Sequence, residues 1–293
     1  MPASLSPLTP SPEAARLWLR SAFKVLRRAL DDVDRAAPGA DTEPVHRLRV
    51  ATRRLHAVLQ VCAPCLGAKA RARAERQVRR LRHRAAEARD VDVMRDTLRH
   101  LAGPRPPRAW RDTLVSLDGT LVRQRQAANA RLLGPVRRAL ARHRDRRHDL
   151  LAAVRPPQSA DITDARTLLA PLVDHHLAVL AGTPLPPRPQ TDALAGLHET
   201  RIAVKRLRYA LELSATLADE PATSNEAALQ ALSALQARLG DVHDLQVLQA
   251  WLREQAIDST ALQARLERRL GQHLRGLARL WQAWLRAAPH LKA

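Results

Sequence analysis

Apolar residues recur every three or four positions along most of this 293-residue chain, which is the period of an amphipathic helix. The pattern is interrupted at stretches rich in proline and glycine, such as residues 36–43, 103–107 and 183–189, where loops are expected. We therefore predict long helices joined by loops, and we expect Pro135 to kink or break the fourth helix. The predicted helices cover about residues 11–35, 44–64, 69–101, 108–148, 163–180, 193–217, 225–255 and 259–287.

Two of these helices have similar sequences. Residues 45–59 read VHRLRVATRRLHAVL and residues 197–211 read LHETRIAVKRLRYAL, an offset of 152 residues. In a second pair of segments, ARDVDVM at residues 88–94 and GDVHDLQVL at residues 240–248, Asp90 matches Asp244 at an offset of 154 residues. Because both offsets are about half of the chain, the sequence predicts an internal repeat.

The composition and the repeat together predict an all-α protein made of two similar halves. Ala and Leu, which favour helices, supply much of the apolar content, whereas aromatic residues make up only 2% of the chain. We expect residues 11–150 to form a first four-helix bundle and residues 161–290 to form a second one. Residues 1–10, rich in Pro and Ser, are predicted to be a disordered tail.

The two matched helices carry candidate binding residues on a face that the apolar stripe does not use. His46, Arg49 and Arg53 stand at positions i, i+3 and i+7, and hence on one face of a helix. The second copy repeats this arrangement with His198, Arg201, Lys205 and Arg208. A solvated basic face is the simpler interpretation, and a pair of structural histidines is another. A solvated face does not require histidine and cations to recur in the same order, so we interpret this face as a binding surface. A pair of structural histidines stays open as the alternative.

The net charge of +20 indicates an anionic partner. Nucleic acid, an anionic membrane surface and free polyphosphate all fit this charge. No run of about 18 apolar residues predicts a membrane span, and the first residues lack the pattern of a secretory signal. We therefore expect a cytoplasmic protein, while the sequence leaves its oligomeric state open.

The cysteines and the histidines outside the repeated motif do not predict a second binding or metal site. Cys62 and Cys65 form a CxxC pair, but no further zinc ligands at suitable spacing accompany them. We expect these cysteines to be buried as small apolar residues. The histidines without a counterpart in the other half, which we expect at the surface, are His143, His148, His175 and His176.

The segments HRLRVATRRL, HETRIAVKRLRY, ARDVDVM and GDVHDLQVL resemble the motifs of the CHAD family, the conserved histidine α-helical domain. This resemblance covers nearly the whole chain from about Ser11. It implies two four-helix bundles related by pseudo-two-fold symmetry, with a basic groove that contains histidine between them. It also implies binding of inorganic polyphosphate, and some family members associate with polyphosphate granules. Other members carry an N-terminal triphosphate-processing domain, for which residues 1–10 leave no room, so we expect a stand-alone member.

The resemblance assigns roles to particular residues of this chain. The implied polyphosphate-binding residues are His46, Arg49, Arg53, Arg54, Arg84, His198, Arg201, Lys205, Arg206, Arg208 and Arg238. Asp90 and Asp244 are expected to support them through ion pairs that aim arginine side chains, rather than to hold a metal ion. Glu199 stands where the first copy has Arg47, so the groove is not expected to be fully symmetric.

Polyphosphate binding suits these residues better than the alternative functions. Arginine can bind two phosphate oxygens at once, and cations one helical turn apart can follow successive phosphates. A nonspecific nucleic-acid-binding protein is the main alternative, but an aromatic content of 2% offers little base stacking. A polyphosphate hydrolase is a weaker hypothesis, because no carboxylate cluster, Walker-type loop, HExxH or GxSxG motif is visible. We therefore expect a binding protein that is not an enzyme and uses no cofactor or metal.

Overall fold

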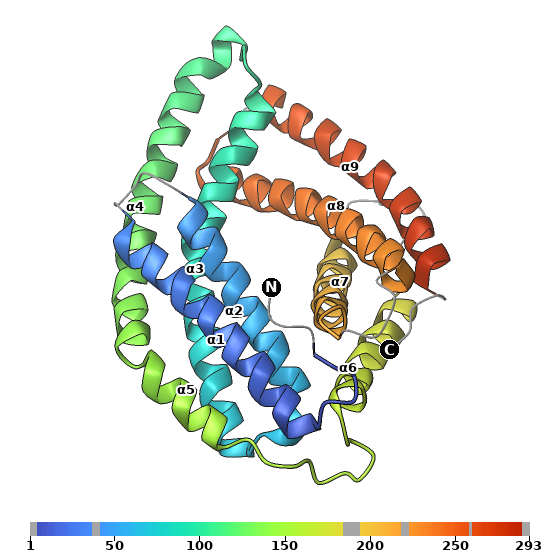
Figure 1. Cartoon of the computed structure of the whole chain (residues 1–293). Coiled ribbons are helices and arrows are strands. Elements are labelled where there is room, and N and C mark those ends of the chain that lie inside the picture. Colours follow the sequence, from blue (N-terminus) through green and yellow to red (C-terminus); the bar gives the residue numbers. More distant parts are fainter. Residues whose placement is uncertain (1–4, 37–41, 184–193, 218–222, 258–259, 289–293) are drawn as a thin grey trace.

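The computed structural model describes residues 5–36, 42–183, 194–217, 223–257 and 260–288, and within these ranges the fold is all-α (Figure 1). The helices of the first half are α1 (Ser11–Arg35), α2 (Glu43–Val61), α3 (Ala68–Ala102), α4 (Arg111–Ala141) and α5 (His143–Ala152). Those of the second half are α6 (Ala165–Ala181), α7 (Leu194–Ser214), α8 (Thr223–Glu254) and α9 (Thr260–Ala287). The all-α prediction is confirmed, and most helix ends lie within a few residues of their predicted positions.

α4 does not break at Pro135, where the sequence predicts a kink or a break. The helix continues through Pro135 and ends at Ala141, after which α5 begins at His143. Proline removes one backbone hydrogen bond from a helix interior, but Leu132 and Val136 are buried on either side of it. Burial of this apolar face against α1 and α3 compensates for the lost hydrogen bond.

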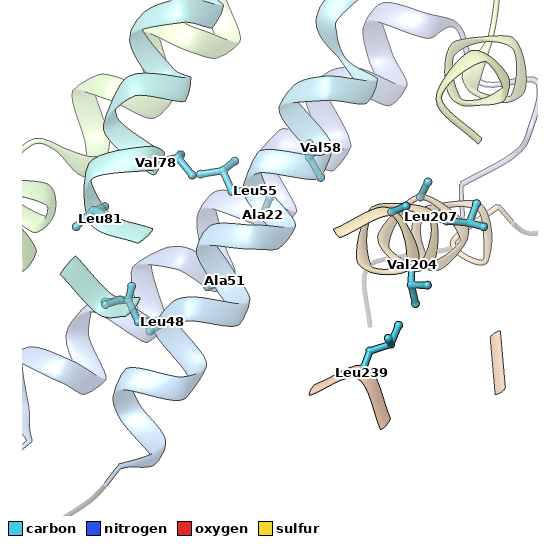
Figure 2. Packing of buried hydrophobic residues seen from close by; sticks show 14 of the residues in the cluster. Ala22, Leu48, Ala51, Leu55, Val58, Val78, Leu81, Val204, Leu207 and Leu239 are labelled. Carbon is cyan, nitrogen blue, oxygen red and sulfur yellow. The ribbon is translucent and has the colours of Figure 1, made fainter. Parts of the chain in front are cut away.

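The apolar stripes of α2 and α7 are buried within their own halves of the molecule. Figure 2 shows Leu55 of α2 beside Val78 of α3, and Val204 of α7 beside Leu239 of α8. All four side chains are buried, and each such burial contributes about 1.5–3 kcal/mol to folding. These contacts determine which face of α2 and α7 turns inward, and they leave another face of each helix for polar residues.

The two halves share an extensive contact. α2 packs against α7, and α3 packs against α8 (Figure 1). The buried apolar side chains of both halves belong to one core cluster. Within each half, consecutive helices pack on each other, from α1 to α4 and from α6 to α9. The division into repeats at residues 11–150 and 161–290, and the pseudo-two-fold symmetry between them, stay predictions.

Residues 5–10 do not form a disordered tail, and that part of the prediction is wrong. Leu5 is buried, and its backbone N–H donates to the carbonyl oxygen of Thr216 at 3.0 Å. The backbone N–H of Ala165 donates to the carbonyl oxygen of Thr9 at 2.8 Å. Proline and serine content indicated disorder, but these long-range hydrogen bonds attach the segment to the second half. The first four residues lie outside the described part of the chain.

Two of the histidines expected at the surface are buried instead. The Nε2 of His143 donates to the carbonyl oxygen of Phe23 at 2.9 Å. His176 is also buried, and burial lowers its pKa to about 4, so its ring is neutral at pH 7. Cys62 and Cys65 are buried free thiols, as predicted. Among the helices described, none combines the length and the apolar character that a membrane span needs.

Candidate functional site

The matched cations of α2 and α7 meet where the two halves of the molecule pack together. Arg49 and Arg53 on α2, and Arg201 and Lys205 on α7, are only partly exposed. Burial and then Arg53 lower the pKa of both Arg201 and Lys205, so the positive charges of the two helices are close together. We call these four residues the central cluster.

The lowered pKa of Lys205 reflects burial and the repulsion among the positive charges of the central cluster. Burial lowers the pKa of Lys205 to about 7, and the three arginines of the cluster add to this effect. Asp244 opposes the shift. An amine with this pKa is only about half protonated at neutral pH. A phosphate group bound nearby would raise the pKa again and restore the positive charge.

Two aspartates accompany the central cluster at matched positions of the repeat. The Oδ1 of Asp90 accepts a hydrogen bond from Arg49 Nη1 at 2.7 Å, which links α3 to α2. Burial raises the pKa of Asp244 on α8, and Arg201 and Lys205 oppose this shift. Each aspartate therefore lies beside cations of its own half, an arrangement that agrees with the supporting role expected for it.

Arg201 has a hydrogen-bond donor that no described residue uses. Its Nε atom is buried and lacks a partner within the described part of the chain. A buried donor without a partner costs about 1–3 kcal/mol. An anion whose oxygen atoms reach this guanidinium would satisfy the donor and add charge-assisted hydrogen bonds.

The two motif histidines lie beside the central cluster. Burial and then the neighbouring Arg89 lower the pKa of His46. The ring of His198 lies 5.7 Å from the ring of His243. Burial, followed by Arg201, lowers the pKa of His243 to about 4. His46 and His243 are therefore mostly neutral at pH 7, where they can donate hydrogen bonds without adding charge.

Three further predicted residues lie at the same junction of α2 and α7. Arg54 and Arg208 both pair with Glu212, at 3.4 Å and 2.9 Å, so one carboxylate links the two helices. Arg206 is exposed and lies close to His56 of α2. Burial first, and then the neighbouring arginines including Arg206, lower the pKa of His56. Positive charge therefore extends along the junction beyond the central cluster.

The structure adds Arg82, Arg89, His243 and Tyr209 to the predicted residues. Arg82 and Arg89 lie two helical turns apart on α3, and each lowers the pKa of a histidine on α2. Tyr209 of α7 is buried and accepts a hydrogen bond from Arg53 of α2. Arg89 and His243 could have been found from the sequence, because they directly precede the paired aspartates. Tyr209 gives no such signal, because its role depends on a contact between the two halves.

Arg84 and Arg238, which the sequence groups with the binding residues, lie elsewhere. The Nη1 of Arg84 pairs with Glu87 at 3.0 Å, and Glu87 also pairs with Arg131 of α4. Arg238 lies against α9, where a Cβ atom on Gly276 would come within 2.8 Å of its Nη1. Both side chains therefore face outer helices rather than the central cluster. Because α3 and α8 are packed on more than one side, their sequence pattern does not show which side faces α2 or α7.

Asp90 and Asp92 point in different directions along α3. Asp92 is buried and forms an ion pair with Arg125 of α4, whereas the side chain of Asp90 is 55% exposed beside Arg49. The two carboxylates therefore do not share a ligand position. In the ranges that the structure covers, no three His, Cys, Asp or Glu side chains are grouped so that they could hold a metal ion.

A family model for the CHAD domain matches residues 19–253 of the chain. The chain belongs to the CHAD domain family. The matched range includes both copies of the motif and therefore every residue of the central cluster. A search of curated proteins finds no match.

Solved structures share the fold of this CHAD domain. The crystal structure of the CHAD domain from the plant Ricinus communis aligns with a TM-score of 0.72 and 25% sequence identity, and the alignment covers 100% of this chain and 96% of that chain. PptA from Streptomyces chartreusis aligns with a TM-score of 0.67 and 17% identity, covering 95% of this chain and 99% of that chain. The likeness to PptA shows the fold alone.

Proposed function

We propose that this CHAD domain binds inorganic polyphosphate at the central cluster and leaves the ligand chemically unchanged. The observation that carries the proposal is the meeting of four partly buried cations, two from each half of the molecule. Like charges in a partly buried place repel each other, as the lowered pKa of Lys205 indicates. A polyanion offsets this repulsion, and folding alone gains nothing from bringing the cations together.

A bare phosphate chain can bind to the donors that Asp90 and Tyr209 leave free in the central cluster. Each of its three arginines presents a planar fork that can bind two phosphate oxygens. Lys205 regains its full charge next to an anion, and the free Nε of Arg201 obtains an acceptor. Further cations continue the positive surface at the junction, namely Arg54, Arg82, Arg89 and Arg206.

Nucleic acid is a weaker candidate for the same place. Phosphate contacts attract any polyanion, but binding of single strands also draws on exposed aromatic rings. Tyr209, the aromatic residue beside the central cluster, is buried and bonded to Arg53. A DNA duplex, whose major groove alone is about 12 Å wide, would reach partly buried side chains less readily than a single chain of phosphates.

Competition binding tests this proposal. Labelled long-chain polyphosphate on the protein is displaced by unlabelled polyphosphate, duplex DNA or RNA at equal phosphate concentration and over a series of salt concentrations. We expect polyphosphate to compete at least ~10-fold more strongly than either nucleic acid, a difference of about 1.4 kcal/mol. Equal competition at every salt concentration would indicate a nonspecific basic surface instead. Incubation with Mg²⁺ is expected to release no phosphate from the bound chain.

A further inference from the structure

A second basic surface lies between α1 and α5, outside the junction of α2 and α7. The surface is hollowed, with a volume of about 1160 Å³. Arg20, Lys24 and Arg28 line it from α1, and Arg144 and Arg147 line it from α5. No carboxylate belongs to its described lining. We call these five residues the outer cluster.

The charges of the outer cluster are not compensated by the protein. All five side chains are exposed, and none forms an ion pair or a hydrogen bond with a described residue. Arg27, at the edge of the same hollow, differs because it pairs with Asp31 at 2.8 Å. An ordinary solvated surface mixes charges of both signs, whereas the outer cluster brings cations from two helices together without an acid between them.

Contacts between α1 and the segment that contains α5 fix the positions of the two helices that line the hollow. At the base of the hollow, His143 donates its Nε2–H to the carbonyl oxygen of Phe23 at 2.9 Å. The same two rings meet edge to face at 5.6 Å. Just after α5, the carbonyl oxygen of Val154 accepts a hydrogen bond from Arg16 Nη2 at 3.2 Å. The outer cluster is therefore mounted on two helices that are attached to each other.

We infer that this hollow is a second binding site for inorganic polyphosphate. The identity of the ligand rests on the proposed function of the central cluster. Arg20, Lys24 and Arg28 follow one another at intervals of one helical turn, so they form a row about 12 Å long. Arg144 and Arg147 form the opposite row, also about one turn apart. A linear chain that lies in the hollow along α1 contacts both rows, and successive phosphates meet successive cations.

Other anionic partners match the hollow less well. Its lining contains no Phe, Tyr or Trp on which a base could stack. A flat lipid surface would touch the rims of the hollow, whereas Arg20 and Arg144 line its opposite sides. A narrow phosphate chain is the ligand that can reach both rows at once.

Calorimetric titration with tripolyphosphate tests the inference, because this short ligand allows each site to be counted separately. We expect the wild-type protein to bind two tripolyphosphates per chain. A variant with Arg20, Lys24, Arg144 and Arg147 all replaced by Gln is expected to lose one of them and to retain the other. These side chains are exposed, so the circular dichroism spectrum and thermal midpoint are expected to stay unchanged. A charge-matched control replaces four exposed arginines of α9, namely Arg268, Arg275, Arg279 and Arg286, by Gln and is expected to retain both sites.

The possible results separate this inference from the proposed function. Retention of two sites by the outer-cluster variant would overturn the inference. The inference would also be overturned if the outer-cluster variant lost binding of duplex DNA or phosphatidylserine vesicles but kept both tripolyphosphates. Failure of the proposed function would give a different result. A variant with the central cluster replaced by Gln would still bind two tripolyphosphates, whereas the outer-cluster variant would still lose one of them.

Discussion

Lys205 is the residue at which the repulsion within the central cluster is most evident. Its amine can release a proton, and its pKa of about 7 reflects burial and the arginines around it. The neighbouring arginines stay charged across the physiological range. In the free protein, Lys205 therefore gives up part of its charge near neutral pH, and a bound polyanion reverses this.

Polyphosphate binding is predicted to take up a proton at Lys205. Because the pKa is about 7 in the free protein and a bound polyanion is expected to raise it, affinity should fall as the pH rises from 7 to 9. Below pH 7 the amine is largely protonated in both states, and its contribution to the pH dependence levels off. Calorimetry at pH 8, in two buffers with different ionisation enthalpies, measures the proton uptake.

The Lys205→Arg variant is the control for this titration, because arginine keeps its charge. It should bind with less proton uptake than the wild-type protein and with a weaker pH dependence. Equal uptake by both proteins would show that Lys205 does not titrate on binding, and that the phosphate groups or other residues account for the protons.

Sequence comparison within the chain identified part of the site at the level of single residues. The pairs Arg49 with Arg201 and Arg53 with Lys205 follow from the repeat, and all four meet in the structure. The same comparison also paired Arg84 with Arg238, which face α4 and α9. A repeat identifies equivalent positions, but it does not tell which neighbouring helix they face.

The helices themselves were predictable because their apolar periodicity is long and uninterrupted. α1 and α9 follow the predicted ranges closely. The exception is α4, which continues through Pro135, although the local rule predicts a kink or a break there. Burial of the residues around that proline depends on α1 and α3, which lie far away in the sequence. The same dependence on distant contacts explains why the order of residues 5–10 was missed.

Replacement of Pro135 by Ala is predicted to stabilise the protein. The helix is continuous at this position, so alanine restores one backbone hydrogen bond without changing the fold. The free energy of unfolding should rise by up to about 3 kcal/mol, the difference between Pro and Ala in a helix interior. Denaturant unfolding measures the change, and polyphosphate affinity should stay the same because Pro135 lies outside the central and outer clusters.

Gly134→Ala is the matched control in the same turn of α4. Its Cβ atom would meet the flexible end of Arg138 at 3.4 Å, and alanine should add about 1 kcal/mol through helix propensity alone. A loss of stability in Pro135→Ala, with a gain in Gly134→Ala, would show that the packing of α4 requires the proline.

The whole molecule combines a net charge of +20 with specific places where cations gather. Its two halves each provide one side of the central cluster, so the site exists only when they pack together. Total charge alone would make any polyanion bind anywhere on the surface. We therefore expect the position of the cations to determine polyphosphate affinity more than the net charge does. A comparison of variants with equal net charge tests this expectation.

The most direct measurement compares two fourfold variants in polyphosphate binding over a salt series. The first replaces Arg49, Arg53, Arg201 and Lys205 by Gln, and the second replaces Arg268, Arg275, Arg279 and Arg286 of α9 by Gln. Both lose the same number of basic residues. The control arginines are taken from α9 because exposed arginines of α5, such as Arg144 and Arg147, line the outer hollow.

We predict that the central cluster is the tighter of the two sites, so that the highest affinity of the central variant falls by at least ~100-fold, or about 2.7 kcal/mol. Its salt dependence should also become shallower, by roughly 0.7 in slope for each lost phosphate contact, by analogy with single-stranded nucleic acids. The α9 variant should stay within about threefold of the wild-type affinity, a change below about 1 kcal/mol. If both variants lose the same affinity at every salt concentration, net charge determines binding and the central cluster is not a specific site.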